Sequence, residues 1–220
     1  ETLPAVVQEF PGITCDAYCE EGAWSVKQTT ALFEKATALN CPIRAHVDQF
    51  NPLGMLRKAV EMGAKSVDHL EASTDDELKL LAASNTMGVF LPSSGFCLHD
   101  AYARGREIID LGCAVAIATN YNPGSAPSPS MPFTISLACR RLGLTPAEAI
   151  TAATFNAACV LDLQSKVGTI EEGKRADIQL LDCNDERELA WHVSSGSPLL
   201  VAIKGEIVHL LTDGEMDIEG

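Results

Sequence analysis

Short apolar runs alternate with longer amphipathic segments over the first 160 residues of the chain. The apolar runs predict five strands, at residues 13–19, 43–47, 66–70, 86–91 and 114–119. Their starts lie 20 to 30 residues apart, which is the length of one strand, one helix and two loops. This alternation predicts an α/β fold built from about five βα units around a parallel sheet.

The amphipathic segments carry the residues that begin and end helices. Ser25 is placed to cap a helix that continues to Asn40, and capping-box spacing recurs after Thr74 and Thr145. Glycines follow three of the apolar helical patterns, where left-handed C-terminal caps are expected: Gly63, Gly112 and Gly143. The punctuation therefore agrees with the alternation of strands and helices.

The pattern changes near residue 163. Residues 166–181 predict short β-segments joined by a glycine turn, and residues 199–210 predict a hairpin around Gly205. We therefore expect a barrel part over residues 1–163, a small β-subdomain over residues 164–212 and a frayed acidic tail at residues 213–220.

Five strands are too few for an eight-stranded barrel. Residues 2–10 resemble the end of a preceding helix, so we expect a partial barrel that is completed by a missing N-terminal half or by a homodimer partner.

Thirty acidic and sixteen basic side chains give a net charge of −14, which disfavours nucleic acid and anionic membranes as partners. No uninterrupted apolar run approaches the roughly 20 residues of a membrane span, and the N-terminus lacks the pattern of a signal peptide. The eight cysteines form no CxxC pair, and most lie in apolar runs. A protein of the reducing cytoplasm fits this composition best.

Polar residues follow several predicted strands at the edge where functional groups of parallel sheets gather. His46 and His69 end successive strands, 23 positions apart, and adjacent parallel strands lie about 4.8 Å apart. Each histidine alone is more typical of a hydrogen-bonded interior residue. Taken as a pair, the two histidines are as consistent with a shared metal or catalytic site as with interior packing roles. His99, His192 and His209 lack such a setting and predict surface or packing roles.

The segment 116–125 joins an apolar strand to a polar loop that turns through Asn122, Pro123 and Gly124. Backbone N–H groups and side-chain amides in such a loop suit a carboxylate or a planar heterocycle. A simple βα turn explains the same residues equally well.

Several separate motifs, in order, resemble imidazolonepropionase, a metal-dependent amidohydrolase of histidine degradation. They are residues 15–22, 45–49, 67–70, 120–125, 130–132 and 154–158, followed by the glycine pattern at 168–177. The resemblance extends from about residue 10 to residue 182. It implies a (β/α)8 TIM-type barrel with a composite β-subdomain, and one zinc or iron ion at the barrel mouth.

In that family the metal activates water to open the ring of 4-imidazolone-5-propanoate, which gives N-formimidoyl-L-glutamate. The resemblance makes His46 a metal ligand and His69 the histidine that assists the reacting amide and water. Asn120 matches the position of a further metal ligand. The resemblance also makes Asn122, Gly124 and Ser125 substrate contacts, and Gln49 matches a catalytic, substrate-contacting position.

This chain departs from the family at three points. The family's His-x-His pair and the Arg and Tyr residues that grip the substrate have no counterpart here. Asn120 stands where the family has an aspartate ligand, and Gln49 stands where it has a glutamate. A neutral amide supplies no negative charge to a metal and accepts no proton from water. We therefore expect this chain alone to be inactive.

Three functional hypotheses remain open from the sequence. The first is an imidazolonepropionase-like hydrolase whose site is completed by further residues. The second is a catalytically impaired homologue that keeps the scaffold, and the third is an amidohydrolase acting on another cyclic amide, because a fold does not fix a function.

Overall fold

The chain folds around a five-stranded parallel sheet in the computed structural model, which describes residues 2–193 and 198–211. The strands follow the order of the sequence across the sheet. They are β1 (Cys15–Cys19), β2 (Ile43–Val47), β3 (Ser66–His69), β4 (Met87–Phe90) and β5 (Val115–Ile117). Each predicted strand is present, and four of the five are one to three residues shorter than predicted. The predicted tail at residues 213–220 lies outside the described residues.

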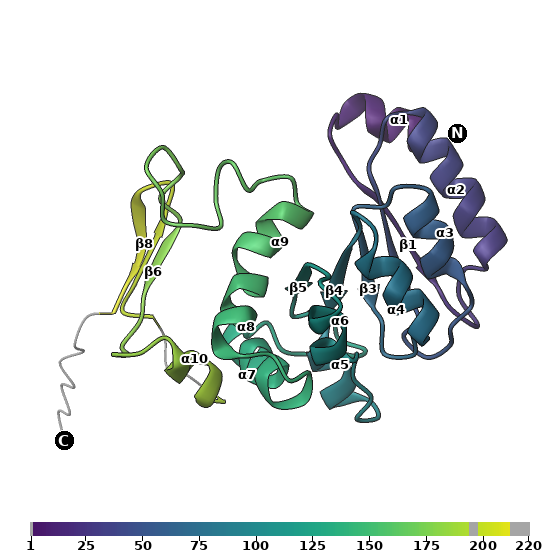
Figure 1. Cartoon of the computed structure of the whole chain (residues 1–220). Helices are drawn as coiled ribbons and strands as arrows, with labels where there is room; N and C mark the ends of the chain where they lie inside the picture. The colour runs from purple at the N-terminus through teal and green to yellow at the C-terminus, as the bar shows by residue number, and fades with distance from the viewer. Residues whose placement is uncertain (1, 194–197, 212–220) are drawn as a thin grey trace, which may run out of the picture.

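Helices connect the strands and cover the sheet (Figure 1). They are α1 (Thr2–Glu9), α2 (Val26–Ala38), α3 (Met55–Glu61), α4 (Asp75–Ala82), α5 (Pro92–Cys97), α6 (Gly105–Asp110), α7 (Met131–Arg141), α8 (Pro146–Ala153) and α9 (Phe155–Val160). Between β4 and β5 the chain departs from the expected single helix per βα unit, because both α5 and α6 precede β5.

The helix ends follow the sequence signals. Ser25, Thr74 and Thr145 each form a complete capping box with the residue three positions later. Gly63, Gly112 and Gly143 adopt positive φ angles of 74°, 86° and 72°. Local hydrogen bonding therefore fixes where these helices begin and end.

The two faces of the parallel sheet differ in chemistry. On one face, Ala17, Ala45 and Val67 lie in register and belong to a core that includes Phe33 of α2 and Leu56 of α3. The opposite row begins with Tyr18, His46 and Asp68 and continues into Val89 and Ala116. The polar half of this second row therefore lies beside an apolar half on the same face.

Helix α9 packs on the apolar half of that row. Val160 lies in a small core with Val89 and Ala116, and its carbonyl accepts a hydrogen bond from Arg44 Nη2 at 2.6 Å. Asn156 Nδ2 donates to the carbonyl of Val115 at 2.7 Å. Within the described residues β1 and β5 each pair on one side only, so the sheet is a partial barrel.

A three-stranded antiparallel sheet lies beyond α7, α8 and α9 in Figure 1. It consists of β6 (Ile178–Leu180), β7 (Leu200–Ile203) and β8 (Glu206–Leu210), and the hairpin around Gly205 is as predicted. The prediction of a strand in the first half of residues 166–181 is wrong, because that stretch forms turns. The short helix α10 (Arg187–Trp191) packs against α7 and was not predicted. No described helix is long and apolar enough to cross a membrane.

Glu148 joins a helix cap to an ion pair, and this gives a pH-dependent prediction. Its carboxylate accepts from the backbone N–H of Thr145 at 2.8 Å and pairs with Arg106 at 2.8 Å. The Arg106 hydrogen bond and the Thr145 backbone N–H lower the pKa of Glu148 to about 2. The stabilisation is therefore complete above pH 4.5, the ordinary value, and is lost as pH falls toward 2.

We expect Glu148→Gln to lower the free energy of unfolding by roughly 1–2 kcal/mol at pH 7, measured by urea denaturation. The difference from the parent chain should shrink as pH falls below 4.5. Glu61→Gln is the matched control, because Glu61 is exposed and its ion pair with Lys58 lies at the surface. A Glu148→Gln effect that stays constant between pH 7 and pH 2.5 would contradict the assigned ion pair.

Candidate active site at the carboxyl edge of the sheet

Several strands leave the carboxyl edge of the parallel sheet through left-handed backbone. Asp48 after β2 has φ 54°, His69 and Leu70 at the end of β3 have φ 87° and 74°, and Asn120 after β5 has φ 51°. Non-glycine residues seldom adopt this conformation, and for a bulky residue such as leucine it is an outlier. Strained backbone of this kind gathers at functional sites, so this edge is the candidate for the active site.

The left-handed end of β3 brings His69 next to His46. In the strand register His69 pairs with Val47, which faces the helices, whereas His46 belongs to the opposite row. The two imidazole rings nevertheless lie 5.6 Å apart, centroid to centroid. The Tyr18 ring lies 6.4 Å from both, so three aromatic side chains from three adjacent strands form one cluster.

His46 is held by carboxylates of the neighbouring strands. Its Nδ1 lies 3.0 Å from Asp16 on β1 and 3.9 Å from Asp68 on β3. Burial lowers the pKa of His46, but the hydrogen bond and charge of Asp16, together with the charge of Asp68, outweigh it and leave the pKa above its ordinary value. A carboxylate on Nδ1 leaves Nε2 as the ring atom available for a ligand.

Gln49 joins the aromatic cluster through Tyr18. The Tyr18 hydroxyl lies 2.9 Å from Gln49 Oε1, and the Gln49 side chain is buried. Gln49 therefore lies beside Tyr18, whose hydroxyl occupies the oxygen of its amide.

Two carboxylates near the carboxyl edge, Asp48 and Glu20, have shifted pKa values. Burial and the charges of Glu77, Glu20 and Glu71 together raise the pKa of Asp48 to about 7, although the hydrogen bond from the Ser73 hydroxyl at 2.8 Å opposes them. Burial also raises the pKa of Glu20, but hydrogen bonds from Asn51 and from backbone N–H groups outweigh it and lower the net value.

The loop after β5 is held together by its own side chains. Asn122 Oδ1 accepts from the backbone N–H groups of Gly124 at 2.9 Å and Ser125 at 2.7 Å. These N–H groups are therefore already engaged, which corrects the expectation that the loop exposes them to a ligand. Asn120 Nδ2 donates to Ser94 Oγ at 2.8 Å, which ties the loop to α5.

The predicted residues thus fall into two groups on one edge of the sheet. His46, His69 and Gln49 gather around Tyr18, and the loop residues Asn120, Asn122, Gly124 and Ser125 gather around β5 and α5. In the sheet order only β4 lies between β3, which carries His69 of the first group, and β5, which leads into the loop of the second. Parallel pairing throughout puts both groups at the same edge, as the sequence predicted.

The described residues do not fit a complete metal site. Catalytic zinc sites use three protein ligands and an open position. Within residues 2–193 and 198–211, no three side chains of His, Cys, Asp or Glu are grouped so as to hold an ion. At Asn120 the donor is a neutral amide, so the donor set has too few ligands and too little charge.

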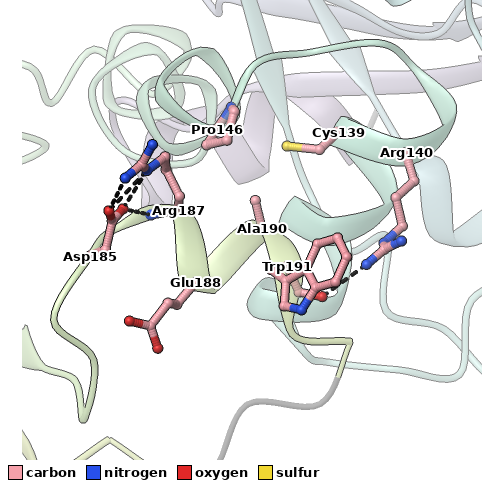
Figure 2. A pocket seen from close by; sticks show the side chains of 8 residues that line it. All are labelled: Cys139, Arg140, Pro146, Asp185, Arg187, Glu188, Ala190 and Trp191. Atoms are coloured by element: carbon pink, nitrogen blue, oxygen red, sulfur yellow. Dashed lines mark hydrogen bonds and ion pairs between the residues drawn. The ribbon is translucent and has the colours of Figure 1, made fainter.

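A pocket of about 560 Å³ lies elsewhere, between α10 and the helices α7 and α8 (Figure 2). Its two guanidinium groups are already engaged: Arg187 with Asp185, and Arg140 with the Trp191 carbonyl at 2.9 Å. None of the predicted site residues lines it, so we assign it no part in the site.

Sequence reasoning missed the side chains that hold the histidines. Asp16 lies within the motif at residues 15–22 but has no role assigned there, and Glu71 lies outside the motifs, yet each contacts an imidazole Nδ1. For Asp16 the alternating pattern of β1 contained a usable signal, because it places Asp16 and Tyr18 on the face of His46. The Glu71 contact depends on the positive φ angles of residues 69–70, which no sequence pattern predicted.

Comparison with known proteins decides the family. The model of the amidohydrolase family matches residues 6–208, which is most of the chain. The chain belongs to the amidohydrolase family. Imidazolonepropionases are similar to it: that of Symbiobacterium thermophilum is 41% identical over 211 residues, and that of Herpetosiphon aurantiacus is 42% identical over 216 residues.

Each of these alignments covers 94% of this chain but only 49% and 51% of the relative. The chain therefore spans about half the length of the curated amidohydrolases it matches.

Solved structures agree on the fold. An adenosine deaminase from Xanthomonas campestris with bound zinc has a TM-score of 0.76 at 18% identity and covers 92% of this chain and 53% of its own. A triazine hydrolase variant has a TM-score of 0.75 at 18% identity, over 94% of this chain and 54% of its own.

The incomplete donor set predicts weak metal binding by this amidohydrolase chain on its own. After equilibrium dialysis against micromolar zinc, metal analysis should find well below one zinc per chain, and His46→Ala should change the content little. His192→Ala, at an exposed position far along the chain, is the control for adventitious binding. Retention of one zinc per chain that His46→Ala abolishes would show that the donor set is complete after all.

Proposed function

We propose that this chain supplies part of the active site of an imidazolonepropionase-like amidohydrolase, which hydrolyses the cyclic amide C–N bond of 4-imidazolone-5-propanoate to N-formimidoyl-L-glutamate. The observation that carries the proposal is the pair of imidazoles 5.6 Å apart at the carboxyl edge of the sheet, each with its Nδ1 against a carboxylate. Similarity to imidazolonepropionases over 94% of the chain supports the choice of substrate.

In this proposal His69 moves the proton. Its Nε2 takes a proton from water as the water oxygen adds to the amide carbonyl carbon, and returns it to the ring nitrogen as the C–N bond breaks. Atoms balance, because one water adds across one amide bond. Gln49 beside Tyr18 orients the ring, and the Asn122, Gly124 and Ser125 loop contacts the propanoate arm.

The site needs further ligands, because the described residues lack a full donor set. We propose that another polypeptide segment, or a second copy of the chain, completes the barrel beside the edges of β1 and β5 that have no strand partner among the described residues. The completed site would hold one zinc or iron ion with His46 and Asn120 among its ligands. The zinc reported for the adenosine deaminase of the same fold supports this expectation.

A catalytically impaired homologue is the second candidate, and one observation favours it. Asn120 binds Ser94 through Nδ2, so only a neutral oxygen remains for a metal, and Gln49 offers no carboxylate. A third candidate, hydrolysis of another cyclic amide, remains compatible with the same geometry.

The compartment and partners belong to the same proposal. Eight free thiols support a reducing cytoplasm, and the charge of −14 supports a small-molecule substrate rather than nucleic acid or a membrane.

The full chain, co-expressed with the half of the Symbiobacterium thermophilum imidazolonepropionase that it does not match, tests the proposal. We expect the complex to bind about one metal ion and to consume imidazolonepropanoate slowly. The double variant Gln49→Glu with Asn120→Asp should be faster by about 10²–10⁴, because it restores a carboxylate for the metal and one for proton transfer.

Gln179→Glu with Asn184→Asp makes the same chemical change at exposed positions and should leave the rate unchanged. A double site variant with stoichiometric metal and no turnover would reject the hydrolase, and a substrate panel would then separate the third candidate. Equal activity of parent and double site variant would reject the impaired homologue.

A further inference from the structure

We propose that Glu71 is a positioning residue that holds His69 in the tautomer with the proton on Nδ1. His69 Nδ1 lies 3.3 Å from Glu71 Oε1, and the two side chains are only 3% and 5% exposed. The pair is therefore shielded from water. In such an interior environment a hydrogen bond orients its partners more strongly than it does at the surface.

The backbone is built to allow this contact. In a regular strand, residues two apart point to the same face and lie nearly 7 Å apart along the chain. His69 and Leu70 both have positive φ, which ends β3 and folds Glu71 back toward the imidazole. Leu70 is fully buried in the core, so the packing of its side chain holds the strained turn in place.

The chemistry of the contact fixes the proton. An ionised carboxylate only accepts hydrogen bonds, so the imidazole nitrogen facing it must carry the hydrogen. In a neutral ring the other nitrogen, Nε2, is then a bare acceptor. His46 has the same arrangement with Asp16, so the two neighbouring rings each have Nδ1 held by a carboxylate.

Glu71 has little else to bind. Its second oxygen, Oε2, is buried and has no hydrogen-bond partner among the described residues. Among the described residues, His69 is the side chain that hydrogen-bonds to Glu71. A polar atom left unpaired in the interior is unfavourable. Orienting the His69 ring and fixing its tautomer gives a reason for a buried carboxylate with an unpaired oxygen at this position.

The use of this tautomer in catalysis rests on the proposed function, because a bare Nε2 is what a proton acceptor at the strand edge requires. The tautomer itself does not rest on it. Its test therefore needs neither metal nor substrate, and its failure is distinct from the failure of the co-expressed complex to turn over.

Proton–nitrogen correlation spectra of the histidine rings in the full chain test the inference at about pH 8.5, above the usual titration range of imidazole. His69→Asn identifies the signals of His69. We expect His69 to carry its proton on Nδ1 in the parent chain. In Glu71→Leu, which removes the acceptor, the population should shift toward the tautomer with the proton on Nε2.

Glu71→Gln keeps an acceptor oxygen and should preserve much of the Nδ1–H population, which is the rescue that a purely structural role does not predict. Glu61→Leu, at an exposed helix position, should leave the spectrum of His69 unchanged. The parent spectrum alone decides if Glu71→Leu fails to fold. A His69 that carries its proton on Nε2, or on both nitrogens, in the parent chain overturns the inference.

Discussion

The site depends on the way in which parallel strands end. Parallel pairing puts the carboxyl ends of all strands at one edge of the sheet. A residue with left-handed backbone at such an end breaks the regular alternation, so the side chains that follow no longer point to the faces that the strand pattern would give them. At β3 this constraint decides the geometry, because the strand register alone would point His69 toward the helices with Val47. The left-handed turn brings its ring beside His46 instead.

The rest of the site follows from that meeting of two rings. Each imidazole has a carboxylate on Nδ1, Asp16 for His46 and Glu71 for His69, so the neighbouring strands orient the rings as well as place them. Tyr18 lies 6.4 Å from both rings and binds Gln49, which links a third strand to the cluster. The row of side chains that contains Tyr18 and His46 continues across the sheet as Val89 and Ala116, and α9 packs on these two residues. The polar groups are therefore confined to one half of that face.

The sequence predicts the scaffold better than the contacts. Strands and capped helices are signalled by local patterns, and Ser25, Thr74 and Thr145 cap as their spacing indicates. The edge that carries His46, His69 and Asn120 also follows from parallel βα order. What could not be predicted depends on backbone angles and on tertiary partners: the turn at residues 69–70, the Asn122 oxygen that engages the Gly124 and Ser125 N–H groups, and the bond from Asn120 to Ser94. A motif gives the identity of these residues but not the orientation of their polar atoms.

The chain is an amidohydrolase by family, and its described residues hold an oriented pair of imidazoles but no group of three His, Cys, Asp or Glu side chains able to hold a metal ion. A crystal structure of the chain measures the claim most directly. The account predicts positive φ at His69 and Leu70 and ring centroids near 5.6 Å apart, with Asp16 and Glu71 on the two Nδ1 atoms. An extended His69 whose ring lies beside Val47, on the helix-covered face, would contradict it.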